Sequence, residues 1–333
     1  MRKHTLCFLM MLGAMVTLTS AYAQQKMEKS FKPSELWHDT DGQLINAHGG
    51  GILYANKKYY WFGEKRGKQV SQGVTVYSSK DLYAWKYEGV ALSPDKNSES
   101  EITEGCLIER PKVIYNKKTS KYVMWFHLEL KGKGYAAAKV GVAVSDKVTG
   151  PYKFVDSFRP NGNMSRDMNL FVDDDGSAYH IYSSDENMNM RISKLTNDYL
   201  KATKEDKLLF RRQREAPAIF KYQKRYYLVS SGCTGWAPNE ASVHMADNLF
   251  GPWKLMGDPM KGPNAKSTFG GQSTYVLPLV GKKDAFIFIA DKWNPKDLMD
   301  SRYIWLPVQF IEGQVKIEWM DQWNLDWFKK TIL

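Results

Sequence analysis

The sequence predicts an all-β fold, a five-bladed β-propeller that forms a single domain. An aromatic strand pattern occurs five times, at residues 58–63, 121–126, 178–183, 225–230 and 285–290. The leading aromatic residues of successive copies lie 63, 57, 47 and 60 residues apart. Similarity at a period of this size is typical of propellers and solenoids, and residues of this kind favour strands over helices.

Short strands flank the copies of this pattern. An apolar segment and a turn come before it, as at 51–57, 113–117 and 170–176. A third strand is expected after it, at 73–78 and 140–145, and a further short motif follows at 82–86, 149–153 and 250–254. Four strands per unit, repeated five times, describe a propeller. A large β-sandwich is the alternative, but its strands would not repeat at this spacing.

The first 23 residues have the pattern of a signal peptide. Arg2 and Lys3 precede an apolar run at 6–18, and Ala21-Tyr22-Ala23 is a typical cleavage site. The run is shorter than the roughly 20 apolar residues that a membrane-spanning helix needs. We therefore expect export to the periplasm or the medium without a membrane anchor, and a mature propeller domain at 24–333.

Charge and cysteine content restrict the partners only weakly. The net charge of the chain is +11, and its basic residues are scattered. Scattered charge favours a solubilising surface, and attraction to an acidic glycan is the alternative. No nucleic-acid motif accompanies the charge, so a nucleic-acid partner is not expected. Cys106 and Cys233 remain after the signal peptide, and the sequence predicts neither their pairing nor the oligomeric state.

Candidate site residues lie where the blades are expected to begin, because the innermost strands of a propeller line its central channel. Glu109, Asp167 and Glu215 each precede an apolar strand at such a position. Burial of an unpaired carboxylate is costly, so three at equivalent positions favour a shared polar centre. The alternative is that each acid pairs with the arginine next to it in sequence, although neighbours on a strand point to opposite faces.

Convergent carboxylic groups without a metal or cofactor motif favour glycoside hydrolysis. One acid must stay protonated to donate to the leaving oxygen, while a second group activates water or attacks the sugar. Crowding of carboxylates raises the pKa of one of them. Four tryptophans are suited to stack on sugar faces, although most aromatic residues are expected in the core: Trp61, Trp125, Trp236 and Trp293.

Longer motifs resemble those of glycoside hydrolase family 43, specifically its exo-β-1,3-galactanase type, over nearly the whole mature chain. The resemblance rests on residues 45–52, 60–64, 109–112, 214–217 and 271–274. It implies an exo-acting, inverting enzyme that releases galactose from the non-reducing end of β-1,3-galactan in arabinogalactan. An α-L-arabinofuranosidase on the same scaffold is the alternative, and a non-catalytic sugar-binding propeller is a third possibility.

The resemblance also implies roles for single residues. Glu215 matches the general acid, Glu109 matches the acid that holds substrate and tunes the pKa of that acid, and Gln272 matches a glutamine that faces the anomeric carbon. Residues that hold the terminal sugar are matched by Glu64, Asp167, Tyr135 and Thr234.

The start of the first blade holds two further candidates and one departure. His48 and Asn46 are candidates for substrate binding from their position, with a buried core role as the alternative for His48. Most of the family has an aspartate here as general base, whereas this sequence has no carboxylate at 45–47. The base therefore stays open between Gln272, as its imidic tautomer or as a residue that places the water, and Glu109. No cofactor is expected, and a structural calcium, possible in this family, has no ligand pattern here.

Overall fold

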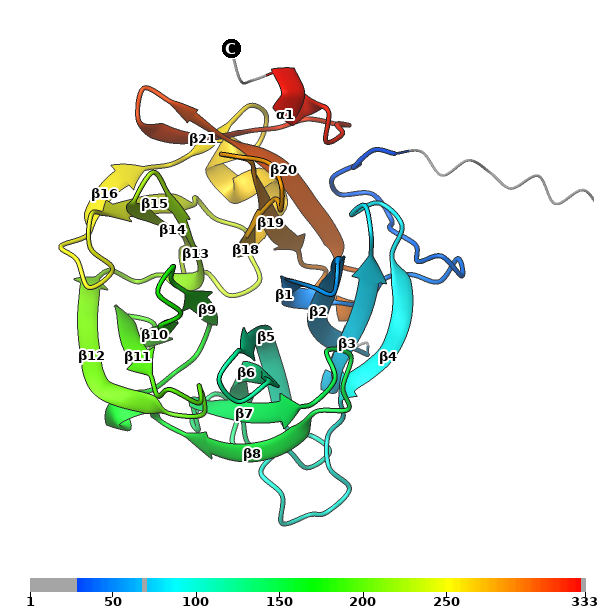
Figure 1. The fold of residues 1–333 in the computed structure, drawn as a ribbon, viewed down its shortest axis with the longest axis vertical. Coiled ribbons are helices and arrows are strands. Elements are labelled where there is room, and N and C mark those ends of the chain that lie inside the picture. Colours follow the sequence, from blue (N-terminus) through cyan, green and yellow to red (C-terminus); the bar gives the residue numbers. More distant parts are fainter. Residues whose placement is uncertain (1–28, 68–70, 331–333) are drawn as a thin grey trace, which may run out of the picture.

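The computed structural model describes residues 29–67 and 71–330. These residues form five sheets that stand like blades around a central axis (Figure 1). The arrangement confirms the five-bladed propeller that the repeats predict. The signal peptide expected at 1–23 lies outside the described residues.

The first three blades each contain four antiparallel strands in chain order. Blade one has β1 (His48–Ala55), β2 (Lys58–Arg66), β3 (Ser71–Ser79) and β4 (Lys86–Leu92). Blade two has β5 (Leu107–Asn116), β6 (Lys121–Glu129), β7 (Lys139–Ser145) and β8 (Lys153–Phe158). Blade three has β9 (Met168–Val172), β10 (Ala178–Ser184), β11 (Asn189–Leu195) and β12 (Ala202–Arg211).

The fifth blade departs from the expected four strands. Blade four has β13 (Glu215–Tyr222), β14 (Arg225–Ser231), β15 (Ser242–Ala246) and β16 (Lys254–Gly257). Blade five has β17 (Met260–Lys261), β18 (Gln272–Pro278), β19 (Phe286–Lys292), β20 (Arg302–Ile311) and β21 (Gln314–Glu318). The extra strand is β17, which pairs in parallel with β21 and so forms the outer edge of the blade. The short helices are η1 (Pro160–Gly162), η2 (Ala265–Gly270), η3 (Leu298–Asp300) and α1 (Trp327–Lys330).

Each copy of the aromatic pattern forms the second strand of its blade, namely β2, β6, β10, β14 and β19. Blades on either side cover both faces of these strands, so nearly every side chain in them is buried. Burial on both faces explains why the pattern is a continuous apolar run rather than an alternation. The core lies between neighbouring blades, as where Phe62 of blade one joins the cluster of Met124 of blade two.

Polar side chains join the inner strands at the axis. Each inner strand pairs only with the second strand of its own blade, so its remaining backbone groups need other partners. Asn169 Nδ2 donates to Pro217 O at 3.0 Å and to Thr274 O at 3.3 Å. Thr274 Oγ1 donates to Gly50 O at 3.0 Å, and Lys112 Nζ donates to Gly49 O at 2.9 Å. These bonds connect all five inner strands in the order β13, β9, β18, β1 and β5.

The ring closes where blade five meets the segment before blade one. Tyr303 of β20 donates its hydroxyl to Ile45 O at 2.8 Å and accepts the backbone N–H of Ala47 at 3.0 Å. Further out, Phe31 and Trp323 exchange two backbone hydrogen bonds of 2.7 and 3.1 Å. The last blade is therefore held to the first by side-chain and backbone contacts rather than by a shared strand.

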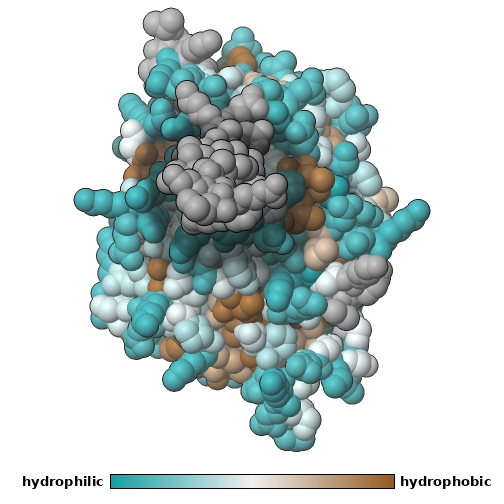
Figure 2. All heavy atoms as spheres, turned by 90° about the vertical axis from the view of Figure 1, so that its right-hand side faces the viewer, coloured by the Kyte–Doolittle hydropathy of each residue, from teal (hydrophilic) through white to brown (hydrophobic). Residues whose placement is uncertain are grey.

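The side of the molecule drawn in Figure 2 is mostly polar where its residues are coloured. Figure 2 shows the side of the ring near β3 and β4, where hydrophilic side chains predominate and apolar ones form small patches.

Cys106 and Cys233 are both free thiols. In the part of the chain that the structure describes, no helix combines the length and apolar character that a membrane crossing requires.

Removal of the Tyr303 hydroxyl is expected to weaken the closure of the ring. The substitution Tyr303→Phe leaves a buried N–H and a buried carbonyl without this partner, which costs about 1–3 kcal/mol. The free energy of unfolding in urea measures the loss. Tyr115→Phe, on a ring that is 37% exposed, is the control and should change stability by less than about 0.5 kcal/mol. Equal urea midpoints for Tyr303→Phe and the native protein would contradict the closure role.

Candidate active site

Bulges near the start of the inner strands aim polar side chains at the axis. The pairing register shifts within β1, β5 and β13, just after the first residues of the paired segment. Inside these bulges Gly49, Arg110 and Ala216 have φ values of +56°, +52° and +52°. A bulge bends a strand and redirects its side chains, and positive φ at a non-glycine residue is a strain that clusters at functional sites. The bulges follow Glu109 and Glu215 directly.

A pocket of about 240 Å³ opens at this end of the axis and is lined from all five blades. Six of the nine sequence-predicted site residues line it, one or more from each blade: Glu64, Glu109, Tyr135, Asp167, Glu215 and Gln272. The bulges and the convergence of the inner strands thus bring together residues that lie more than 200 positions apart in the chain.

Glu215 lies between two side-chain amides. Gln272 Nε2 donates to its Oε1 at 2.8 Å and Asn187 Nδ2 donates to its Oε2 at 3.0 Å. Burial, followed by repulsion from Asp167, raises the pKa of Glu215 to about 7. A carboxylic acid with such a pKa keeps its proton in a large fraction of molecules near neutrality, as a proton donor must.

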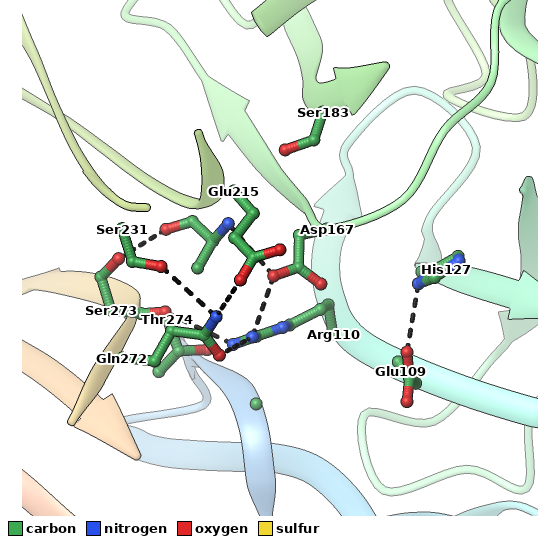
Figure 3. Close-up of polar contacts among 12 residues, drawn as sticks. Glu109, Arg110, His127, Asp167, Ser183, Glu215, Ser231, Gln272, Ser273 and Thr274 are labelled. Carbon is green, nitrogen blue, oxygen red and sulfur yellow. Dashed lines mark hydrogen bonds and ion pairs between the residues drawn. The ribbon is translucent and has the colours of Figure 1, made fainter. Parts of the chain in front are cut away.

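Asp167 is the neighbour of Glu215 whose carboxylate contributes to the raised pKa of that acid. Its carboxylate accepts the backbone N–H of Ala216 at 3.1 Å and lies 2.9 Å from Arg110 Nη2 (Figure 3). Asp167 therefore pairs with an arginine of another blade and not with its sequence neighbour Arg166. Glu109 and Arg110 both line the pocket, because the bulge at Arg110 breaks the usual alternation of a strand.

The amide of Gln272 has its hydrogen-bonding groups occupied. Its Oε1 accepts from Trp293 Nε1 at 2.9 Å and from Arg110 Nη2. Its Nε2 donates to Glu215 and, at 3.3 Å, to Ser231 Oγ. Two groups that can only donate face the oxygen, and this stabilises the amide over an imidic tautomer, whose own O–H would point towards them.

Glu109 lies on the other side of Asp167 in a group of its own (Figure 3). Its Oε1 accepts from Arg66 Nη2 at 2.7 Å and from Tyr135 Oη at 3.0 Å. Its Oε2 lies 3.3 Å from His127 Nδ1. Burial alone would raise the pKa of Glu109, but the contacts from His127 and Arg66 outweigh it and lower that pKa far below its usual range. These contacts favour the ionised form of Glu109.

Arg66 and Arg110 connect Glu64 to the rest of the site. Arg66 Nε donates to Glu64 Oε2 at 2.6 Å, while its Nη2 reaches Glu109. The backbone N–H of Arg110 donates to Glu64 Oε1 at 2.8 Å. Glu64 is 1% exposed, so only a small part of its carboxylate faces the pocket. The two arginines hold that carboxylate in place.

Three predicted site residues do not line the pocket. Thr234 Oγ1 donates to Ala237 O at 2.6 Å within its own loop, beside the pocket residues Gly235 and Trp236. His48 is fully buried, stacks on Tyr303 at 5.1 Å, and lies 3.5 Å from Asp291. This is the buried placement that was the alternative for His48.

Asn46 is the third of these residues and supports Arg66. Its Nδ2 donates to Arg66 O at 2.8 Å, and its Oδ1 accepts the Arg66 backbone N–H at 2.9 Å. The side chain therefore acts on the site through the backbone of a pocket arginine.

The four tryptophans divide into two groups. Trp61 and Trp125 are buried in the core, with 2% and 0% of their surface exposed. Trp236 and Trp293 line the pocket in an edge-to-face pair with centroids 5.6 Å apart. This pair provides the apolar ring surface that sugar stacking requires.

Sequence reasoning missed Arg66, His127 and Asn187. Asn187 ends a turn in which Asp185, Glu186 and Asn187 all have positive φ, and nothing in the sequence predicts this conformation. His127 and Glu129 are polar residues at alternate positions of an apolar strand, which was an available signal. Among residues 29–67 and 71–330, no group of three or more His, Cys, Asp or Glu side chains is arranged to hold a metal ion.

Known proteins match both the sequence and the fold. Residues 48–292 match the family described as glycosyl hydrolases family 43. The chain belongs to this family. A search of the curated proteins found no match.

Solved structures of family members resemble the enzyme closely. A GH43 β-1,3-galactosidase solved with galactodeoxynojirimycin is 48% identical, with a TM-score of 0.87 over 89% of this chain and 100% of its own. An exo-β-1,3-galactanase from Phanerochaete chrysosporium solved with β-1,3-galactotriose is 39% identical, with a TM-score of 0.83 over 89% of this chain and 68% of its own. An exo-β-1,3-galactanase from Clostridium thermocellum is 36% identical, with a TM-score of 0.82 over 89% of this chain and 66% of its own.

The pKa of Glu215 predicts where kcat/KM falls on the alkaline side of the pH profile, that is, its alkaline limb. A proton donor with a pKa of about 7 loses activity as the pH rises through that value, so kcat/KM should fall to half near pH 7. The substitution Asp167→Asn removes a negative charge, which lowers the pKa of Glu215 and shifts the limb to lower pH.

A pH series of kcat/KM for the two proteins measures this shift. Asp146→Asn, at a carboxylate that is 78% exposed and paired with Lys121, is the control and should leave the limb in place. A limb that stays where it is in Asp167→Asn would show that Asp167 does not tune Glu215.

Proposed function

We propose that the enzyme is an exo-β-1,3-galactanase that releases galactose from the non-reducing end of β-1,3-galactan in arabinogalactan. The observation that carries this proposal is the pair Glu215 and Gln272, a carboxyl group with a raised pKa in direct contact with a neutral amide. The likeness to solved β-1,3-galactosidases and exo-β-1,3-galactanases supports the choice of substrate.

The shape of the site supports action at a chain end. Its volume of about 240 Å³ is below the range of about 300–1,000 Å³ that is usual for drug-sized ligands. Such a pocket suits a terminal sugar better than a length of polysaccharide. Carboxylates and arginines line its walls, which suits the many hydroxyl groups of a sugar, while Trp236 and Trp293 offer a face for stacking.

Glu215 performs the acid step in this proposal. It donates its proton to the glycosidic oxygen as the bond to the leaving sugar breaks. The carboxylate that results accepts hydrogen bonds from Gln272 and Asn187, and such charge-assisted bonds stabilise the ionised form. The negative charge of Asp167 favours the return of a proton before the next turnover.

Gln272 orients the acid Glu215, to which its Nε2 donates, and does not remove a proton from the attacking water. Its carbonyl oxygen accepts from Arg110 and Trp293, and its amide nitrogen has no lone pair available to take up a proton. Water attacks on the face opposite the leaving group and gives its proton to Glu109, the other candidate base, which lines the pocket. This attack inverts the anomeric carbon, so the first sugar released is expected to be α-galactose.

We also propose that the protein is exported. The basic start, the apolar run at 6–18 and the Ala21-Tyr22-Ala23 motif support this proposal. Export would place the enzyme where plant-type polysaccharides are met outside the cytoplasm.

Product analysis tests the substrate. The enzyme is incubated with β-1,3-galactan, arabinogalactan protein and an aryl α-L-arabinofuranoside, and the products are separated by chromatography and followed by ¹H NMR. Galactose from β-1,3-galactan, first seen as the α-anomer, is the expected result, because an exo enzyme takes terminal sugars and inversion changes their configuration. Arabinose alone would replace the proposal with an arabinofuranosidase, and a β-anomer would contradict inversion.

The substitution Glu215→Gln tests the acid. Because Gln cannot donate a proton to the leaving oxygen, kcat on β-1,3-galactan should fall roughly 100-fold or more, while binding of galactose, measured by calorimetry, should persist. Glu240→Gln, an exposed carboxylate on the same blade that pairs with Lys266, is the control. Full activity in Glu215→Gln would exclude Glu215 as the acid and leave sugar binding as the better description.

A further inference from the structure

Three buried groups form a chain that leads away from the pocket. Glu109 Oε2 lies 3.3 Å from His127 Nδ1, and His127 Nε2 lies 2.8 Å from Glu129 Oε1. The second oxygen of Glu129 accepts the backbone N–H of Ala138 at 3.0 Å. His127 and Glu129 are each 1% exposed, so water does not separate or screen these contacts.

The two carboxylates beside the ring favour a charged imidazole. An ionised carboxylate can only accept hydrogen bonds, and a neutral imidazole has only one N–H. His127 Nε2 hydrogen-bonds Glu129, whereas Nδ1 lies 3.3 Å from Glu109 Oε2 without the alignment of a hydrogen bond. A ring between two carboxylates is stabilised by positive charge, which favours the imidazolium form of His127. In agreement, burial would lower the pKa of His127, but the contacts with Glu109 and Glu129 raise it to about 9.

Other buried histidines of the same protein behave differently. His180 and His244 are buried without a carboxylate at the ring, and burial lowers their pKa values to about 3 and about 4. The contrast shows that burial alone would leave His127 neutral. Glu109, and with it Glu129, which does not line the pocket, raises the pKa of His127 against the effect of burial.

The groups that face His127 come from several elements. Glu109 of β5 and Glu129 of β6 carry negative charge, and the ring of Tyr135 lies 5.8 Å away. Arg66 of β2 shares Glu109 with His127 and also holds Glu64. Glu109 Oε1 accepts from Arg66 and Tyr135, while Oε2 lies 3.3 Å from His127 Nδ1 without a hydrogen bond from it.

We propose that His127 and Glu129 are positioning residues, which keep Glu109 charged and hold its free Oε2 position ready for a hydroxyl group of the terminal sugar. The inference rests on the proposed function for the identity of that sugar, and it extends the active site by one layer beyond the pocket wall. Glu129 acts through His127, and His127 acts through Glu109.

The substitution Glu129→Gln isolates the charge of the outer group. The Ala138 N–H needs an acceptor, so the glutamine oxygen turns towards it and the amide NH₂ faces His127 Nε2. The amide NH₂ can donate to Nε2 only if Nε2 carries a lone pair instead of a hydrogen. His127 then becomes a neutral ring with its hydrogen on Nδ1. The pocket wall itself keeps all of its side chains.

Long-range ¹⁵N–¹H NMR of histidine-labelled enzyme measures the state of the ring directly. In the native protein one imidazole should keep the two similar ¹⁵N shifts of an imidazolium from pH 5.5 to 8, and His127→Gln should remove that signal. In Glu129→Gln the same signal should split into the two distinct shifts of a neutral ring. A neutral His127 in the native protein would overturn the proposal, even if Glu129→Gln failed to fold.

Kinetics on β-1,3-galactan test the effect on substrate. Glu129→Gln should raise KM roughly 10-fold, the order expected when a hydrogen bond to a charged group is weakened, with a smaller change in kcat. Glu88→Gln, at the outer strand of blade one where it pairs with Lys86, is the matched control and should leave both constants unchanged. An unchanged KM together with a neutral ring would refute the link between the chain of groups and the substrate.

The two kinds of readout separate this inference from the proposed function. The NMR experiment needs no substrate, so it decides the charge of His127 whichever sugar the enzyme cleaves. If β-1,3-galactan gives no product while arabinofuranoside does, the proposed function fails, and the same KM comparison is made with the arabinofuranoside.

Discussion

The convergence of five inner strands on one axis is the constraint on which the rest of the structure depends. These strands pair only within their own blades, so the backbone groups that face the axis lack ladder partners. Asn169, Thr274 and Lys112 satisfy them and join all five strands. The bulges of β5 and β13 come directly after the pocket residues Glu109 and Glu215, so the site depends on the same convergence of the inner strands.

Charge balance gives the carboxylates of the pocket different states. Arg66 is shared by Glu64 and Glu109, and Arg110 pairs with Asp167. Glu215 has amide neighbours and no arginine in hydrogen-bonding contact. Its pKa is raised because a buried carboxyl group beside a negative charge is more stable in its neutral form. Burial also raises the pKa of Glu64 in spite of its two arginine contacts, whereas His127 and Arg66 lower that of Glu109.

The neutral amide of Gln272 stands beside Glu215 and near Asp167, where a carboxylate would add a third acidic group. A carboxylate at Gln272 would lie against Glu215 and would compete with Asp167 for Arg110, and crowding of that kind raises pKa values further. A neutral glutamine can donate to Glu215 and accept from Arg110 and Trp293 at once. The glutamine orients the site because its one amide group is hydrogen-bonded to the acid, the arginine and the tryptophan.

The sequence by itself determined the five blades and the place of the acids at their entrances, because strands buried on both faces leave an apolar pattern that repeats with each blade. It did not indicate that Arg110 pairs with Asp167 rather than with Glu109, that His127 and Glu129 support Glu109, or that Thr234, His48 and Asn46 lie outside the pocket. Those features arise from contacts between blades, such as that of Arg66 with Glu109 across 43 positions, and from bulges that reverse the side on which a residue points. Local patterns carry neither kind of information, so only the tertiary structure decided which polar residues meet.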